Sequence, residues 1–228
     1  MKRFFKIVGI LLLLILVAII GLKIAFNEDV PVGTKGEKAV ALADKLLEAL
    51  HAEQIKNADS ITWTFRGVNE YNWQPQNNIV SVKWEDTRVV LDLNFPQEST
   101  VFYKGNIVDS GDKQEYLDYA LSNFNNDSFW LIAPYKVKDA GTELEFISEN
   151  ELLVRYTTGG TTPGDVYVWK LDENYLPESF KMWVQIIPLD GVKANWKGWY
   201  ETTAGFMLPE KREVYGLEIP LTDVRVYP

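Results

Sequence analysis

Apolar and polar residues alternate along most of the chain beyond residue 59. Three early runs, at 61–65, 80–84 and 89–95, place apolar side chains at every second position. This period of two is typical of half-buried strands in antiparallel sheets, where one face is apolar and the other meets water. Seven further strands are expected at 143–148, 151–157, 165–172, 178–187, 194–203, 210–215 and 221–227. Short turn sequences separate these runs and favour pairing between consecutive strands.

Ahead of the strands, the spacing of apolar residues changes to that of a helix. Between Ala39 and Leu50 they recur every three or four positions, with charged residues largely between them. This spacing predicts an amphipathic helix over 37–57. Thr34 and Glu37 have the form of a capping box, which predicts the start of this helix.

A helical insert interrupts the strands between 110 and 133. The spacing of apolar residues over 116–124 predicts a helix, and the polar run 125–128 predicts a turn and a new N-cap. The following run, 129–133, is apolar on all sides until Pro134. A stretch of this kind needs to be covered by the sheet or by a partner.

These elements predict a mainly β (α+β) fold. About eleven antiparallel strands cannot all bury one face of a flat sheet against two short helices, whereas a strongly curved sheet can. We therefore expect a single strongly curved antiparallel sheet, a half-barrel, wrapped around the inserted helix. An N-terminal helix precedes this sheet, and one transmembrane helix precedes both.

The first 26 residues predict a membrane anchor. Basic residues occupy the short tail 1–6, and an apolar segment follows at 7–26, interrupted by Lys23 alone. Twenty helical residues rise about 30 Å, which matches the hydrocarbon thickness of a bilayer. The alternative, a cleaved signal peptide, requires a shorter apolar region and a small-residue cleavage site, which is not evident here. We favour an uncleaved signal anchor.

Charge and cysteine content predict where the rest of the chain lies. The basic tail should stay in the cytoplasm, because basic residues are retained on that side. A linker over 27–36 and an exported β half-barrel domain over 37–228 would then follow. The chain has no Cys, so this domain needs no oxidant to fold and suits a bacterial periplasm. We expect a single-pass protein of the bacterial inner membrane.

Composition excludes several classes of partner. The chain carries 23 Lys and Arg residues against 32 Asp and Glu residues, a net charge of −9, and four of its basic residues lie in the first 26. Such a negative domain repels phosphate backbones, so we expect no nucleic-acid partner. The absence of Cys and the presence of one His argue against a protein-held transition metal. We expect no cofactor.

No catalytic signature is evident. The Gly-rich segment 159–165 (GGTTPGD) lacks the Lys of a phosphate-binding loop and lies between two strands, which indicates a hairpin turn. His51 lies beside the apolar seam of the first helix, where a partly buried packing role is expected. Paired carboxylates are frequent, but their spacing does not place any two across one groove, as glycoside hydrolysis requires. We expect a protein that is not an enzyme.

Eight Trp residues are the unusual feature of the composition. Four of them, Trp63, Trp84, Trp130 and Trp169, share a face with other apolar residues and are expected in the interior. Trp183 shares its parity with polar neighbours and is expected on the outer face of the sheet. Exposed aromatic rings can stack on sugars or line an apolar cavity, and both are binding roles.

Three segments resemble known exported proteins. Residues 126–134 (NDSFWLIAP), 159–165 (GGTTPGD) and 169–177 (WKLDENYLP) are similar to uncharacterised exported proteins of Bacteroidetes. In the last segment, a strand ends in Asp and a Pro opens the next strand, as in the LolA/LolB/RseB superfamily of periplasmic lipoprotein-binding proteins. The resemblance implies an N-terminal helix, an open curved sheet and a helical lid over an apolar cavity. LolB is lipidated on a Cys that this chain lacks.

Three functions follow as expectations. The first is a non-enzymatic, membrane-anchored binding protein that holds an acyl chain, lipid or lipoprotein in an apolar cavity. The expected lining of that cavity is Trp63, Phe65, Trp84, Leu91, Leu93, Phe129, Trp130 and Trp169. The second is an envelope interaction or scaffold domain whose interior is filled. The third is a glycan-binding or glycan-cleaving domain that uses exposed Trp residues and carboxylates.

Overall fold

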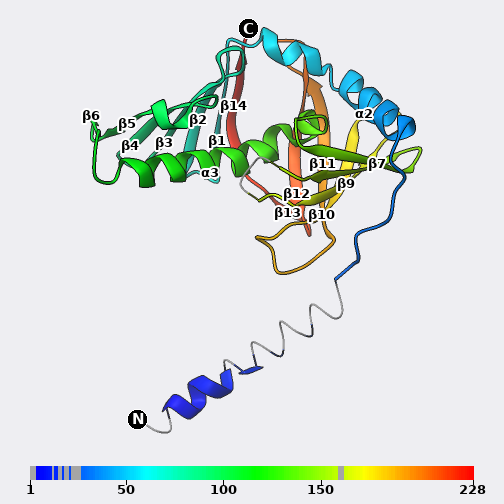
Figure 1. Ribbon diagram of the computed structural model, residues 1–228, viewed down its shortest axis with the longest axis horizontal. Coiled ribbons are helices and arrows are strands. Elements are labelled where there is room, and N and C mark those ends of the chain that lie inside the picture. The colour runs from blue at the N-terminus through cyan, green and yellow to red at the C-terminus, as the bar shows by residue number, and fades with distance from the viewer. Residues whose placement is uncertain (1–3, 12, 15–16, 18–20, 22–26, 159–161) are drawn as a thin grey trace.

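The computed structural model describes residues 4–11, 13–14, 17, 21, 27–158 and 162–228 (Figure 1). Its main helices are α2 (Glu37–Ala49) and α3 (Lys113–Ile132), with short 3-10 turns η1 (Ala52–Asn57), η2 (Pro75–Asn77), η3 (Pro96–Glu98) and η4 (Ala133–Lys136). The rest of the described fold is mainly strand, as the alternating pattern predicts.

The strands form two antiparallel sheets of seven strands each. The first sheet contains, in spatial order, β14 (Leu221–Tyr227), β1 (Ser60–Phe65), β2 (Asn69–Gln74), β3 (Ile79–Trp84), β4 (Thr87–Asp92), β5 (Thr100–Tyr103) and β6 (Asn106–Ile107). The second sheet contains β13 (Leu217–Glu218), β12 (Met207–Val214), β11 (Val192–Glu201), β10 (Pro177–Trp183), β9 (Val166–Leu171), β8 (Glu151–Tyr156) and β7 (Thr142–Ser148).

The prediction of a single sheet is therefore wrong, although its antiparallel order is correct. The two sheets separate after β13, where the chain leaves β12 and crosses to pair β14 with β1. Pro220 lies at this crossing and has no N–H to extend the β12 ladder. Twist also accumulates from strand to strand, so a sheet of this many strands tends to divide in two.

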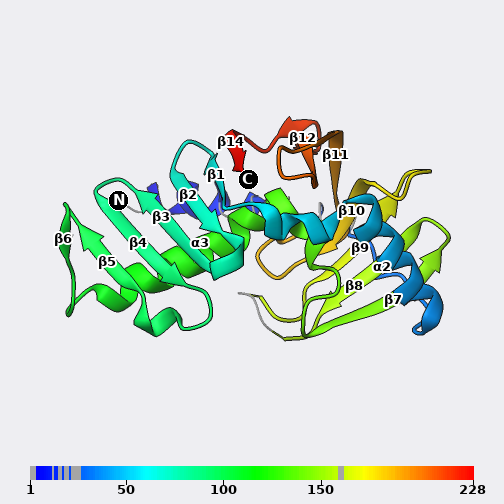
Figure 2. The same ribbon diagram turned by 90° about the horizontal axis from the view of Figure 1, so that it is seen from above.

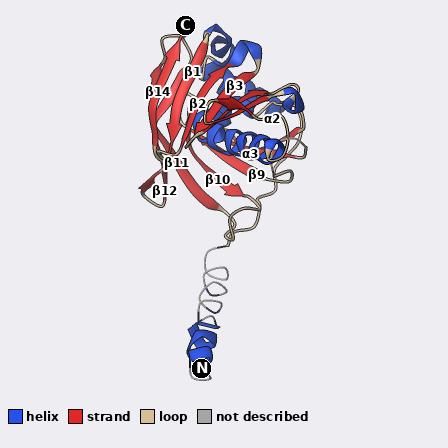
Figure 3. Ribbon diagram, turned by 90° about the vertical axis from the view of Figure 1, so that its left-hand side faces the viewer, coloured by secondary structure: helices blue, strands red, loops and turns tan. Residues whose placement is uncertain are grey.

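Helix α3 connects the two sheets. It runs under the first sheet and continues towards the second, while α2 lies beside the second sheet (Figure 2). Seen from the side, the strands arch over α3 (Figure 3). The expected arrangement of a curved β surface around an inserted helix is thus present, with two sheets in place of one.

The predicted turn at 125–128 is also wrong, because α3 continues through it to Ile132. Asp127 and Ser128 are buried within the helix. The Asp127 carboxylate accepts hydrogen bonds from the Tyr71 hydroxyl at 2.6 Å and the Asn69 amide at 3.0 Å. These contacts with β2 satisfy a side chain that would otherwise favour a turn, so tertiary structure overrides the local preference.

The first helix is shorter than predicted. α2 ends at Ala49, because His51 takes a left-handed conformation with φ of 51° and the chain continues as η1. His51 is exposed rather than packed, and its Nδ1 lies 3.0 Å from the carbonyl oxygen of Gly205. The expected capping box is absent, since the N-cap is Gly36 and makes no side-chain capping bond.

Residues 27–34 lie against the second sheet. Thr34 pairs with Phe146 of β7 through two backbone hydrogen bonds. Glu28 forms an ion pair with Lys181 at 2.5 Å, and its carbonyl oxygen accepts a hydrogen bond from the Trp183 indole at 2.6 Å. The segment predicted as a linker therefore makes specific contacts with β7 and β10.

Trp183 lies with Leu153, Val166 and Val168 in a small cluster separate from the two main cores. Its chain neighbours, Met182 at the end of β10 and Val184 just after it, belong to the core between α2 and the second sheet. Trp183 therefore points to the outer face, as its parity predicts, although the N-terminal segment leaves only 8% of it exposed.

The predicted transmembrane segment 7–26 lies largely outside the described residues. Residues 4–11 are helical. Within the described ranges, no helix combines the length and the apolar character that a membrane crossing requires.

Candidate ligand-binding pocket

The side chains expected to line a cavity divide into three groups. Five of them, Trp63, Phe65, Trp84, Leu91 and Leu93, belong to the core between the first sheet and α3. Trp169 is fully buried in the core of the second sheet, with its ring 4.7 Å from that of Phe180. Phe129 and Trp130 line an open pocket beside α3. The structure thus brings two of the eight residues to one accessible site.

The core under the first sheet is filled by aromatic rings. Trp63 is 1% exposed and stacks on Tyr71 with ring centroids 4.6 Å apart. Phe124 of α3 approaches both of these rings, at 6.2 and 6.1 Å, and also lies 6.1 Å from Trp73. These contacts occupy the space that the sequence predicts as a cavity.

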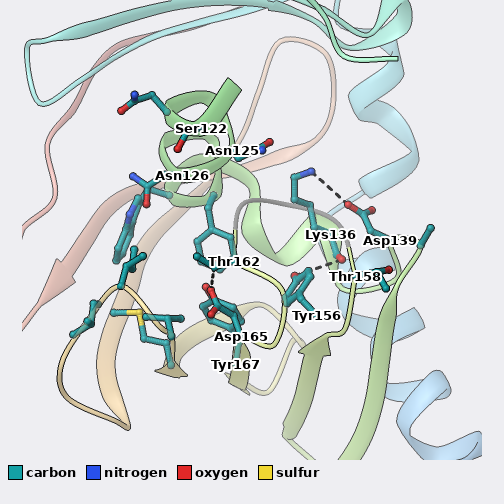
Figure 4. Close-up of a pocket in the computed structure, with 18 residues that line it drawn as sticks. Ser122, Asn125, Asn126, Lys136, Asp139, Tyr156, Thr158, Thr162, Asp165 and Tyr167 are labelled. Carbon is teal, nitrogen blue, oxygen red and sulfur yellow. Dashed lines mark hydrogen bonds and ion pairs between the residues drawn. The ribbon is translucent and has the colours of Figure 1, made fainter. Parts of the chain in front are cut away.

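The open pocket has a volume of about 460 Å³ and lies between α3 and the second sheet. This volume falls within the range of roughly 300–1,000 Å³ that is usual for small-molecule sites. Its walls come from α3, the 3-10 turn η4, the ends of β8 and β9, and the segment after β10. The close-up labels Ser122, Asn125 and Asn126 on the helix, with Tyr156, Asp165 and Tyr167 on the side of the sheet (Figure 4).

Helical spacing explains which α3 side chains enter the pocket. Ser122, Asn125, Asn126 and Phe129 follow one another at intervals of three, one and three residues and share one face of the helix. Phe124 faces the opposite way, into the core of the first sheet. Short polar side chains on the second-sheet side leave space that larger residues would fill.

The floor of the pocket is apolar. The ring of Phe129 lies 4.6 Å from Tyr167 and 6.0 Å from Phe180, so it is held against β9 and β10. Met182, Val184, Ile186, Ile187 and Trp130 complete the apolar lining. Ile186, also part of this lining, is 66% exposed.

Polar and charged groups surround this floor. The Lys136 amine lies 3.4 Å from the carboxylate of Asp139. Asp165 is 5% exposed, and its carboxylate accepts hydrogen bonds from the Thr162 hydroxyl at 2.5 Å and the Gln185 backbone N–H at 3.2 Å. The pocket therefore combines an apolar surface with a few fixed polar groups, which is the usual composition of a binding site.

Two tyrosines in the pocket stay neutral at physiological pH. Burial raises the pKa of the Tyr167 hydroxyl, and the neighbouring Asp165 charge raises it further. Burial likewise raises the pKa of Tyr156, with a smaller effect from Asp139. Neither hydroxyl acts as a base, because the Tyr156 hydroxyl donates to the Lys136 carbonyl oxygen at 3.5 Å and the Tyr167 hydroxyl donates to the Asp165 carboxylate.

A second hollow, of about 580 Å³, lies over β1–β3 and β14. Its lining includes the exposed ion pair between Lys83 and Glu70, at 3.0 Å, and the polar side chains Thr62, Thr64, Asn72, Ser81 and Arg225. This surface offers less apolar area than the pocket beside α3, which is therefore the stronger candidate.

Sequence reasoning does not find the polar part of the pocket. Asp139 and Asp165 are 26 positions apart in the chain, and only the pairing of β7, β8 and β9 brings their segments together. The spacing of Ser122, Asn125 and Phe129 is a usable signal, but the predicted turn at 125–128 removes it.

No known protein family matches the chain. No curated protein sequence matches it either. Among solved structures, the chain is similar to a DUF1329 family protein from Desulfovibrio piger, with 10% sequence identity and a TM-score of 0.40. The similarity covers 84% of this chain and 94% of that one. A match this distant carries no functional inference, so the site rests on its own geometry.

Proposed function

We propose that this chain is a non-enzymatic binding protein that holds an acyl chain or another lipid in the pocket beside α3. Its N-terminal segment anchors it in the bacterial inner membrane, and the β domain lies in the periplasm. The observation that carries this proposal is the apolar floor formed by Phe129, Met182 and Val184 within an open volume of about 460 Å³. An alkyl chain gains free energy roughly in proportion to the apolar area it removes from water.

Two further observations support the proposal. Ile186 and Phe129 are partly exposed at the pocket, so a ligand would cover apolar area that now contacts water. The segment 169–177 also resembles the LolA/LolB/RseB superfamily of periplasmic lipoprotein-binding proteins, and the resemblance implies a helical lid over an apolar cavity. In this chain α3 takes the place of that lid, and its Phe129 and Trp130 side chains line the pocket.

Photo-crosslinking tests this function on the full-length chain. The protein is reconstituted in nanodiscs and illuminated with a dodecyl probe that carries a diazirine near the end of the alkyl chain. We expect cross-links within 122–132 and 182–187, besides those that the anchor makes with any membrane-soluble probe. Cross-links confined to residues 1–26 would contradict the proposal.

A matched pair of variants on α3 provides the control. Ser122 is exposed and lines the pocket, so Ser122→Trp should fill the pocket and abolish the cross-links at 182–187. Asp118 is exposed one turn earlier on the same helix and is absent from the pocket lining. Asp118→Trp should therefore leave those cross-links unchanged.

A second candidate function follows from the filled core under the first sheet. Trp63, Tyr71 and Phe124 occupy the volume in which the expected cavity would lie. A filled interior favours an envelope scaffold domain. If no alkyl probe reaches the pocket beside α3, this scaffold function takes the place of lipid binding.

A further inference from the structure

The Asp165 carboxylate in the wall of the pocket affects which charge a ligand can carry there. Asp165 is 5% exposed, and the groups that donate hydrogen bonds to its carboxylate are neutral: the Thr162 hydroxyl, the Gln185 backbone N–H and the Tyr167 hydroxyl. Buried carboxylates in proteins usually pair with a cation. The Asp165 side chain therefore places a negative charge at the pocket that these hydrogen-bond partners do not neutralise.

The remaining charges of the pocket lining do not balance Asp165. Lys136 is the one cationic residue of this lining, and its amine lies 3.4 Å from the Asp139 carboxylate. The lining thus holds two carboxylates against one amine. An anionic ligand entering this pocket would meet repulsion from Asp165, strengthened by the low dielectric of a partly buried site.

Aromatic rings stand next to the same carboxylate. The rings of Tyr156 and Tyr167 are perpendicular, at 89°, with centroids 5.6 Å apart. Phe129 approaches Tyr167 at 4.6 Å. The faces of aromatic rings attract cations, and clusters of such rings with a carboxylate recognise substituted ammonium groups.

We propose that the pocket selects amphiphiles with a cationic amine head, primary or quaternary, placed against Asp165 beside the rings of Tyr156 and Tyr167. The alkyl chain of the ligand lies on the apolar floor formed by Met182, Val184 and Ile187. This inference rests on the proposed lipid-binding function and adds the charge of the head group. Lipids and free alkylamines share this chemistry.

A structural role for Asp165 is the rival explanation. Its carboxylate joins the loop before β9, through Thr162, to the segment after β10, through Gln185. Asp165→Asn is the informative substitution, because the Asn oxygen can still accept from the Gln185 N–H and its amide can donate to the Thr162 hydroxyl. The variant removes the charge, and its side chain can still form hydrogen bonds with both segments.

The test is competition against the diazirine probe, on the full-length chain in nanodiscs. Three competitors share a dodecyl chain and differ in the head group: dodecyltrimethylammonium, dodecyl maltoside and dodecanoate. We expect the ammonium compound to displace the probe from 182–187 at about tenfold lower concentration than the maltoside, with dodecanoate the weakest. In Asp165→Asn, this advantage should fall to about twofold or less.

Asp172→Asn is the matched control. Asp172 accepts hydrogen bonds from the backbone N–H groups of Asn174 and Leu176 in the next hairpin, and it is not part of the pocket lining. The order of the three competitors should be the same in this variant as in the unmodified chain. A loss of the ammonium preference here as well would overturn the role assigned to Asp165.

The outcomes separate the two proposals. Equal displacement by all three competitors, or a preference for dodecanoate, overturns the inference about the head group and leaves lipid binding intact. An unchanged preference for ammonium in Asp165→Asn overturns the assignment of the charge to that residue. Absence of any probe cross-link at 182–187 overturns both the head-group inference and the proposed function.

Discussion

The two sides of α3 pack differently against the two sheets: one side lies in a filled core, and the other borders an open pocket. Towards the first sheet, the helix presents Leu117, Ala120 and Phe124, which are buried among the aromatic rings of β1 and β2. Towards the second sheet, it presents Ser122, Asn125 and Asn126 above an apolar floor. The size of the side chains on one helix therefore decides which sheet is sealed and which retains a pocket.

The largest expected effect separates two phenylalanines on this helix. Phe124 is 5% exposed within the filled core, so Phe124→Ala should lower the free energy of unfolding by about 3–4 kcal/mol. Phe129 is partly exposed at the pocket, so Phe129→Ala should lower it by about 1–2 kcal/mol and also weaken probe binding. Urea unfolding of both variants measures the difference. Equal losses of stability would break the distinction between a filled and an open side.

The buried polar contact between α3 and the first sheet gives the next effect. Tyr71→Phe removes the hydroxyl that donates to the buried Asp127 carboxylate at 2.6 Å. We expect a loss of about 2 kcal/mol, because a carboxylate that loses a donor is expensive to keep buried. The Tyr119 hydroxyl is more exposed and donates to Asn69 at 3.3 Å, so Tyr119→Phe should cost about 0.5 kcal/mol or less. Thermal unfolding of both variants compares the two contacts.

Tyr71 also predicts a dependence on alkaline pH. Burial, with a contribution from the Asp127 charge, raises the pKa of its hydroxyl above the ordinary value of 10.0. In the unfolded chain the hydroxyl ionises near pH 10, whereas in the folded protein it stays protonated to higher pH. The stability that this group contributes is therefore fully present below pH 10 and is lost as the pH rises further. Chemical unfolding between pH 8 and about pH 11.5 should show this decline, and Tyr71→Phe should make it less steep.

Substitution of Arg212 in β12 should raise the free energy of unfolding, whereas the substitutions described above lower it. Arg212 is 2% exposed, its Nε and Nη2 atoms have no hydrogen-bond partner among the described residues, and its guanidinium lies 5.9 Å from the Trp196 ring. Burial lowers its pKa to about 10. Arg212→Met retains the contact with Trp196 without an unpaired buried charge, so it should raise the free energy of unfolding by about 1 kcal/mol. A marked loss of stability would show that an unidentified partner satisfies this guanidinium.

The outer face of the second sheet should show the smallest effect on binding. Trp183→Phe removes the indole hydrogen bond to the Glu28 carbonyl but leaves an aromatic ring at the site. We expect a loss of about 1 kcal/mol in stability and no change in probe binding. Weaker binding in this variant would mean that the N-terminal segment affects the pocket through the sheet.

The strands are the part of the fold that the sequence predicts well. Period-two runs such as 151–157 and 221–227 coincide with β8 and β14 to within one residue, because a half-buried strand must alternate its side chains. The division into two sheets is not visible in this pattern, since alternation is the same in either arrangement. In the sequence, only Pro220, at the crossing to β14, indicates where the chain passes from one sheet to the other.

The helical insert and the pocket were harder to predict for a common reason. The run 125–128 has the composition of a turn, and only the partners that β2 supplies to Asp127 make it helical. The polar wall of the pocket likewise depends on segments that the second sheet brings together. Contacts between distant residues determine both features, and local spacing does not encode them.

Hydrogen exchange of the full-length chain, with and without dodecyltrimethylammonium, distinguishes the two sides of α3. A ligand should enter beside α3 on the second-sheet side, while the core under the first sheet stays closed. We expect slower exchange within 122–132 and 182–187 on addition of the probe, and no change within 61–93. Protection within 61–93, or no protection in either region, would contradict the account.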